Sequence, residues 1–102
     1  MTISELLSGL DIPSAYGRFT GRQKPPYILY LGSGQAHFIA DSKIYAKQDE
    51  YQVEYYFIDK SKTNEDAIED AFINNGYMYE KSEDVWIEDE NVFVVYYTVW
   101  RP

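Results

Sequence analysis

Few side chains in this sequence have the type and spacing that catalysis needs. His37 is the single histidine and the chain has no cysteine, so a Cys–His pair cannot form. No serine stands in a recognisable nucleophile elbow that would give His37 a partner for acyl transfer. We therefore expect no catalytic residue and no enzymatic activity, and we interpret His37 as an ordinary turn or strand side chain.

Adjacent carboxylates and clustered glycines are the other features that could bind a ligand. Glu69-Asp70 and Glu88-Asp89-Glu90 offer oxygen ligands for a divalent cation, but they lack the alternating ligands and central glycine of an EF-hand loop. Gly32-Ser33-Gly34 is followed neither by Gly-Lys-Ser/Thr nor by a helix start that could hold a phosphate. We expect solvated charges and a hairpin turn, with no metal site and no cofactor.

Composition excludes several classes of protein. The 102 residues are 45% hydrophobic and 18% aromatic, which is too apolar for a disordered tail and fits one globular domain over residues 1–102. The net charge of −8 opposes DNA binding through phosphates. No apolar run approaches the roughly 18 residues of a membrane span, and Glu5 stands where a secretory leader would be basic. We expect a soluble protein that is not exported by a signal peptide and does not contact membranes.

The first third of the chain predicts a short helix followed by a loop. Thr2 and Glu5 match a capping box, and apolar residues at three- and four-residue steps from Ile3 to Leu10 form one stripe. Asp11 to Pro13 end this pattern, because a residue before proline avoids helical angles. Residues 14–26 hold glycines, two adjacent prolines and three basic residues, and we interpret them as a loop.

The remaining chain predicts strands around one main helix. Tyr27 to Leu31 is apolar enough for a strand buried on both faces, and residues 36–40 and 44–47 form short extended pieces around Asp41 and Ser42. Residues 51–58 alternate, with Tyr51, Val53, Tyr55 and Phe57 on one face and Gln52, Glu54, Tyr56 and Ile58 on the other.

The main helix is expected between Asp59 and Gly76. Thr63 can cap it, and Glu65 and Asp66 complement the positive end of the helix. An apolar face runs over residues 67–72, and Asn75-Gly76 ends the helix. Residues 77–80 and 85–88 then predict a hairpin pair, and residues 91–100 give the longest strand signal. The fold class is therefore α+β: a mostly antiparallel sheet of about five strands with one main helix packed on it and a short N-terminal helix.

The predicted strands carry more apolar surface than one helix of about thirteen residues can cover. Tyr27 to Leu31 and Val92 to Trp100 are apolar on both faces, and a monomer would leave a large exposed patch. Self-association would cover it, and the 11 tyrosines suit such an interface. The alternative is that the first helix and the loop of residues 14–26 fold over the second face.

Charge is unevenly distributed along the chain. Residues 49–90 hold 14 acidic and 3 basic side chains, whereas Arg18, Arg22 and Lys24 gather in the proline-bounded loop. Such a bipolar molecule could dock head to tail with a second copy. The alternative is a solvated acidic surface that only maintains solubility. Stacking of single-stranded nucleic acid is disfavoured because the aromatic strands run through the acidic half.

The order of these features resembles small virion proteins of tailed bacteriophages and prophages of Gram-positive hosts, of the head–tail joining or tail terminator type. The resemblance covers about three quarters of the chain and rests on Pro26-Tyr27-Ile28-Leu29-Tyr30, Phe38-Ile39-Ala40-Asp41, Tyr45, Tyr51-Gln52-Val53-Glu54-Tyr55-Tyr56, the helix of residues 65–75, Gly76-Tyr77-Met78-Tyr79-Glu80-Lys81 and Val92-Phe93-Val94-Val95-Tyr96-Tyr97.

This resemblance implies a structural role in the virion, with assembly in the host cytoplasm. It implies a ring, expected to be a hexamer, that contacts tail-tube and head-connector proteins while DNA passes through without specific binding. A stopper or adaptor of the same neck region fits as well. An alternative from another class is an acidic inhibitor that mimics DNA and blocks a host nucleic-acid enzyme. No binding residue is carried over, because no interface motif matches residue by residue.

Overall fold

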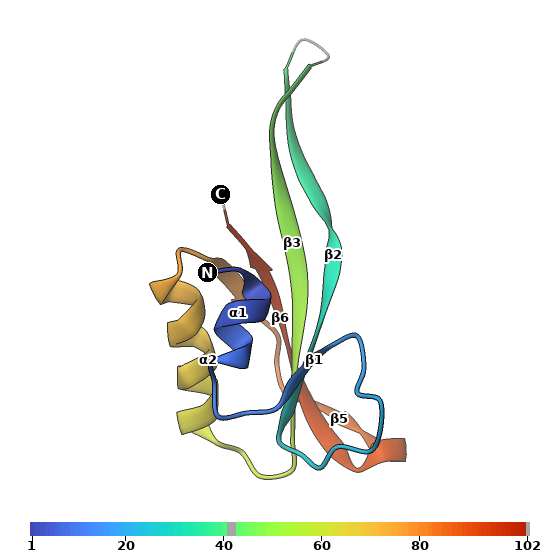
Figure 1. Cartoon of the computed structure of the whole chain (residues 1–102). Coiled ribbons are helices and arrows are strands. Elements are labelled where there is room, and N and C mark those ends of the chain that lie inside the picture. The colour runs from blue at the N-terminus through green and yellow to red at the C-terminus, as the bar shows by residue number, and fades with distance from the viewer. Residues whose placement is uncertain (41–42, 102) are drawn as a thin grey trace.

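The protein is an α+β domain built on one mixed, mostly antiparallel sheet, here seen in a computed structural model (Figure 1). The structure describes the backbone of residues 1–40 and 43–101, and the side chains of residues 1–34 and 49–101. Its elements, in chain order, are α1 (Ile3–Ser8), β1 (Ser14–Tyr16), β2 (Tyr27–Ala40), β3 (Lys43–Phe57), α2 (Lys62–Asn74), β4 (Met78–Lys81), β5 (Val85–Ile87), the 3₁₀ turn η1 (Glu88–Glu90) and β6 (Val92–Trp100).

The sheet has six strands in the order β1-β2-β3-β6-β4, with β5 also paired to β6. All pairings are antiparallel except the short one between β1 and β2. β2 and β3 pair with each other over most of their length, whereas β3 meets β6 only from Glu50 onward. The far part of this hairpin therefore projects beyond the rest of the sheet (Figure 1), and the molecule measures 49 × 28 × 27 Å.

The predicted capping box at the N-terminus is confirmed. The Glu5 amide donates to Thr2 Oγ1 (3.2 Å), and the Thr2 amide donates to Glu5 Oε1 (3.1 Å). These bonds satisfy amides that the first helical turn leaves without partners. The apolar stripe behind this cap buries Ile3, Leu6 and Leu7.

The main helix forms where it was expected, but its cap is different. Ser61, not Thr63, is the N-cap, and its hydroxyl accepts a hydrogen bond from the Asn64 amide (3.1 Å). Thr63 instead lies inside the first turn of α2. The helix ends at the predicted site, with Asn75 as C-cap and Gly76 at φ +78°, a conformation that glycine adopts without steric cost.

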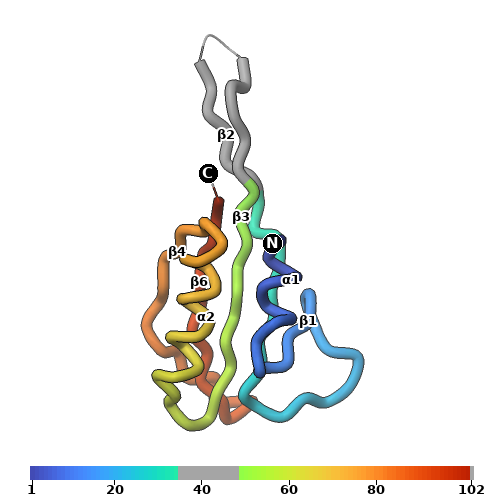
Figure 2. The backbone as a smooth tube through the Cα atoms, turned by 60° about the vertical axis from the view of Figure 1, so that its left-hand side comes forward, coloured from blue at the N-terminus to red at the C-terminus, as the bar shows by residue number. Residues whose placement is uncertain are grey.

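Both helices lie on the same face of the sheet (Figures 1 and 2). The main core joins α1 and α2 to alternate residues of β3 and β6. Val53, Tyr55 and Phe57 are buried there, which confirms the predicted alternation along β3. α1 therefore does not cover the opposite face of the sheet, and the alternative in which the first helix covers that face is wrong. We call this opposite face, which carries neither helix, the open face.

The glycine segment was misinterpreted as a turn. β2 runs through Gly32-Ser33-Gly34 without reversing, and the register with β3 shifts between Gly32 and Gly34. Gly34 has φ +124°, which allows the extra residue of a β-bulge in place of a hairpin turn. The extended pieces predicted at residues 36–40 and 44–47 are thus continuations of β2 and β3. Asp41 and Ser42, the expected centre of that pair, lie outside the described residues.

Two further strand predictions need correction. β4 and β5 do not form a hairpin with each other, because β6 lies beside both of them. Ser82 bridges the gap between them: its amide donates to Tyr96 O (2.8 Å), and its hydroxyl accepts from the Tyr96 amide (2.9 Å). β4 and β5 therefore form one interrupted edge of the sheet. β6 is a strand as predicted, but β2 and β3 are longer.

The region predicted as a loop contains the short strand β1, and only residues 17–26 form the loop itself. Tyr27 to Leu31 is not buried on both faces either: Ile28 is fully buried on the helix side, but Leu31 on the open face is 40% exposed. The sheet is thus apolar on one face and mixed on the other.

Candidate interaction surface

The open face is defined by strand register, because residues paired across strands project from the same side of a sheet. It consists of Tyr27, Leu29 and Leu31 of β2; Glu50, Gln52, Glu54 and Tyr56 of β3; Val92, Val94, Tyr96, Thr98 and Trp100 of β6; Met78 and Glu80 of β4; and Val85 and Ile87 of β5. No helix of the described part of the chain covers it (Figure 1).

One end of the open face is apolar, and its side chains pack against one another. Tyr56, Val92 and Val94 form a small buried cluster there. The Tyr27 ring stacks on Tyr56 with centroids 4.8 Å apart, and Phe19 of the 17–26 loop meets Tyr27 edge-on at 5.5 Å. The loop therefore borders this end of the face and covers part of it.

The middle of the open face is polar. Glu54 accepts hydrogen bonds from Gln52 Nε2 to Oε2 and from the Tyr56 hydroxyl to Oε1, both at 2.7 Å. Burial, followed by the hydrogen bond to the Glu54 carboxylate, raises the pKa of Tyr56 well above its ordinary value. Tyr56 therefore stays a neutral donor, and the charge of Glu54 is held in place by neutral groups alone.

The other end carries the acidic half of the open face, which we define as Leu31, Glu50, Glu54, Met78, Glu80, Thr98 and Trp100. Its apolar members are accessible, with Leu31 40% and Met78 54% exposed. None of the ion pairs in the described part of the chain involves Glu50, Glu54 or Glu80. This half thus combines accessible apolar groups with carboxylates that form no ion pair among the described side chains.

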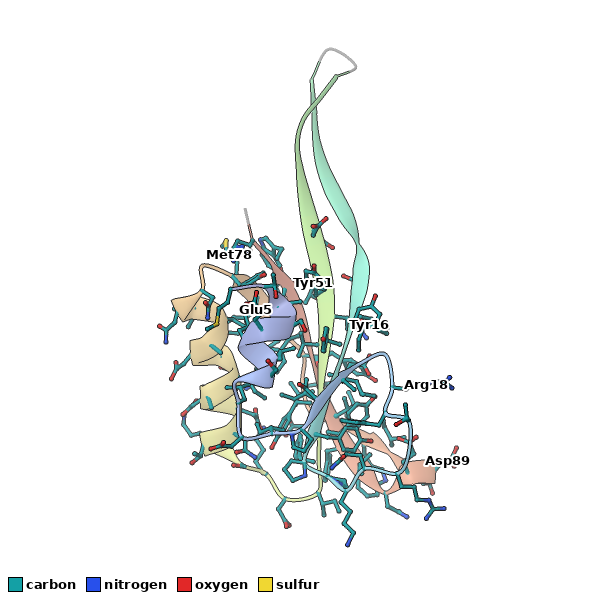
Figure 3. All side chains as sticks on the ribbon, viewed as in Figure 1. Glu5, Tyr16, Arg18, Tyr51, Met78 and Asp89 are labelled. Atoms are coloured by element: carbon teal, nitrogen blue, oxygen red, sulfur yellow. The ribbon has the colours of Figure 1, made fainter. Side chains whose placement is uncertain are left out.

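The basic loop, too, forms no ion pair with the side chains that the structure describes. Arg18, Arg22 and Lys24 are exposed, and no described ion pair includes them. The acidic turn η1 lies at the same end of the molecule as the loop: the charge of Glu90 contributes to a raised pKa of Tyr27, after burial, and Arg18 and Asp89 project on the same side in Figure 3. The sequence predicted a basic pole and an acidic pole, but acidic and basic residues lie together at this end of the molecule.

The helix-covered face contains an ionic cluster that sequence reasoning missed. Glu65 was interpreted as a charge complementing the helix N-terminus, but it is 2% exposed. Its Oε1 lies 2.7 Å from Lys81 Nζ and its Oε2 lies 2.8 Å from Lys60 Nζ. The Lys60 ammonium is aligned to donate to Oε1 (3.0 Å), so Oε2 has ion-pair contact without a well-directed hydrogen bond.

Glu69 completes this cluster. Its carboxylate accepts from the Tyr97 hydroxyl (2.7 Å), from Lys81 Nζ (2.9 Å) and from the Tyr79 hydroxyl (3.1 Å). Burial alone would raise the pKa of Glu69, but these three hydrogen bonds outweigh it and lower the pKa. Burial and the same carboxylate raise the pKa of Tyr97. The cluster joins α2 to β4 and β6, and each of its charges has an opposite partner, as a structural network requires.

The residues that the sequence singled out for chemistry do not converge. Glu69 belongs to the ionic cluster, Asp70 is exposed on α2, and Glu88, Asp89 and Glu90 form the exposed turn η1. The side chain of His37 lies outside those that the structure describes. Among the described residues, no three His, Cys, Asp or Glu side chains are arranged to hold a metal ion.

A cavity of about 320 Å³ lies where the two chain ends meet. Thr2, Asp49, Tyr51, Tyr77 and Arg101 line it. Arg101 stacks over the Tyr77 ring at 4.4 Å and donates to Met1 O (2.9 Å) and Asn75 O (3.3 Å). Its guanidinium thus ties the chain ends together, and we assign no ligand to the cavity.

No helix in the described part of the chain is long and apolar enough to cross a membrane. Comparison with known proteins gives no family assignment: no protein-family model matches the sequence, and a search of curated proteins finds no match.

Proposed function

We propose that this chain is a structural protein of a tailed bacteriophage or prophage, which forms a ring at the head-proximal end of the tail or in the neck. One observation carries the proposal: both helices pack on the same face of the sheet and leave the open face uncovered. That face combines exposed Leu31 and Met78 with partly buried Tyr96 and Trp100, a composition typical of protein interfaces. The resemblance in the order of strands and tyrosines points to the tail terminator or head–tail joining class.

The other properties of the chain agree with such a role. The sequence offers no recognisable set of acid, base and nucleophile, which a structural subunit does not need. The net charge of −8 suits a ring through which DNA slides, because like charge keeps phosphates from adhering. The expected partners are further copies of the chain, in a ring that the resemblance implies to be hexameric, and the tail-tube and head-connector proteins beside it.

The ion pairs of the subunit involve some of the carboxylates that a DNA mimic would need. A DNA mimic needs carboxylates free to face a basic enzyme at phosphate-like spacing. Here Glu65, Glu69, Asp66 and Asp84 are each paired with a lysine. Glu65 and Glu69 stabilise the subunit itself and are not available to an enzyme. Glu50, Glu54 and Glu80 form no ion pair in the described part of the chain, and the DNA mimic therefore stays an alternative that the lysate experiment tests.

Light scattering after gel filtration, together with electron microscopy, tests the proposed function. We expect closed rings of one size, either for the pure protein or after addition of tail-tube protein from the same phage. A persistent monomer at high concentration that does not associate with the tube protein would contradict the proposal. Capture of a basic nucleic-acid enzyme from host lysate would instead support the DNA mimic.

A further inference from the structure

We infer that the 17–26 loop of one copy docks on the acidic half of the open face of the next copy. This inference rests on the proposed function, since it names the surfaces that join neighbouring subunits. Three cations of the loop, Arg18, Arg22 and Lys24, and three carboxylates of the face, Glu50, Glu54 and Glu80, all lack an ion pair in the described part of the chain. The two surfaces match in charge and in number of charges.

The positions of the two surfaces favour contact between copies over contact within one copy. The loop borders the open face at Tyr27, through the edge-on contact of Phe19. Leu31, in the acidic half, lies four residues further along β2, which corresponds to about 13 Å of extended strand. The loop therefore flanks one end of the face, Glu54 lies in the middle opposite Leu29, and Glu50 and Glu80 lie toward the other end. Because unlike surfaces meet, each copy can bind two neighbours and the contact can close into a ring.

The chemistry of the face fits arginine in particular. The Glu54 carboxylate is oriented by Gln52 and Tyr56 at 2.7 Å, so it is held ready for an incoming guanidinium. Trp100 and Tyr96 on the same face offer aromatic surfaces on which a guanidinium can stack. No ion pair in the described part of the chain joins the acidic turn η1 to the loop, so the loop cations keep their charge for a partner.

Charge reversal on each surface tests the contact. The loop variant carries Arg18→Glu and Arg22→Glu, and the face variant carries Glu50→Lys and Glu80→Lys. Each variant alone should lose assembly, with subunit affinity reduced by at least about 10-fold. An equimolar mixture should assemble again, because the reversed loop of one variant matches the reversed face of the other. Native mass spectrometry should then show the two variants alternating in the ring.

The controls separate this inference from the proposed function. Asp70→Lys reverses an exposed charge on α2, on the helix-covered face of the sheet, and should leave assembly unchanged. Circular dichroism melting checks that each variant is folded. If the wild type assembles only on tail-tube protein, assembly of the variants and of their mixture is measured in the presence of that protein.

Three outcomes overturn the inference. Rings that persist in both variants would show that other surfaces join the subunits, while the proposed function would stand. Loss of assembly in each variant without recovery in the mixture would exclude a direct contact between these two surfaces. A wild type that stays monomeric with and without tube protein would overturn the proposed function as well.

Discussion

The carboxylates on the two faces of the sheet have different kinds of partner. On the helix-covered face, Glu65 is 2% exposed and contacts two lysine ammonium groups. On the open face, Glu54 is partly exposed and is held by an amide and a phenol. A buried carboxylate needs an opposite charge to offset its lost hydration, whereas one oriented by neutral donors keeps its charge available to a partner. The first arrangement stabilises the subunit, and the second leaves a carboxylate on the open face available for contact with another protein.

Replacing the same residue type on both faces should give the largest contrast. Leu7→Ala, at a fully buried position of α1, should lower the free energy of unfolding by about 3 kcal/mol. Leu31→Ala, at a position 40% exposed on the open face, should lower it by less than about 1 kcal/mol. Denaturant titrations of both variants measure the difference. Equal losses would mean that the open face is buried in the isolated subunit and that the contrast is wrong.

Removing a lysine from each kind of ion pair should give a smaller contrast. Lys81→Met takes one of two cations from buried Glu65 and should destabilise by about 2 kcal/mol, less than for a fully buried pair because 33% of the Lys81 side chain is exposed. Lys62→Met, which removes an exposed pair with Asp66 on α2, should leave the melting temperature nearly unchanged. If Lys81→Met leaves the stability unchanged, Lys60 alone is enough to compensate the charge of Glu65.

Acid stability should depend on Glu69 by a modest amount. Its pKa is lowered in the folded state, so its stabilising contribution is complete above the ordinary Glu pKa of about 4.3 and is lost as pH falls through the folded value. Glu69→Gln should therefore lose less stability than the wild type on acidification from pH 7 to pH 3. Asp70→Asn, at the adjacent exposed carboxylate, is the matched control and should keep the wild-type slope in thermal melts at each pH.

Features set by residues close in sequence could be predicted. The capping box of Thr2 and Glu5 is a four-residue pattern, and the helix end at Asn75-Gly76 follows from the left-handed conformation of the glycine. The alternation of residues 51–57 reports a strand with one buried face. Each of these signals is complete within one element, so no knowledge of the tertiary structure is needed to interpret it.

Features set by distant residues could not be predicted. Gly32-Ser33-Gly34 suits a turn or a bulge equally well, and pairing with β3 decides between them. β4 and β5 appeared to be partners because they are adjacent in sequence, but both pair with the more apolar β6. From the sequence, Glu65 is an ordinary acidic residue at a helix N-terminus. Its ion pair with Lys81 forms only because β4 lies next to α2 in the fold. The open face likewise depends on where α1 packs, which no local pattern encodes.

The interruption at Ser82 bears on how copies of this protein can aggregate. A continuous outer strand offers unpaired amides and carbonyls on which a foreign strand can align and continue without limit, as in amyloid fibres. Here the outer row is broken between β4 and β5, and the Ser82 side chain occupies a main-chain bonding position of Tyr96. A template of this kind offers only a four-residue and a three-residue run. Open-ended strand addition along this border is therefore discouraged.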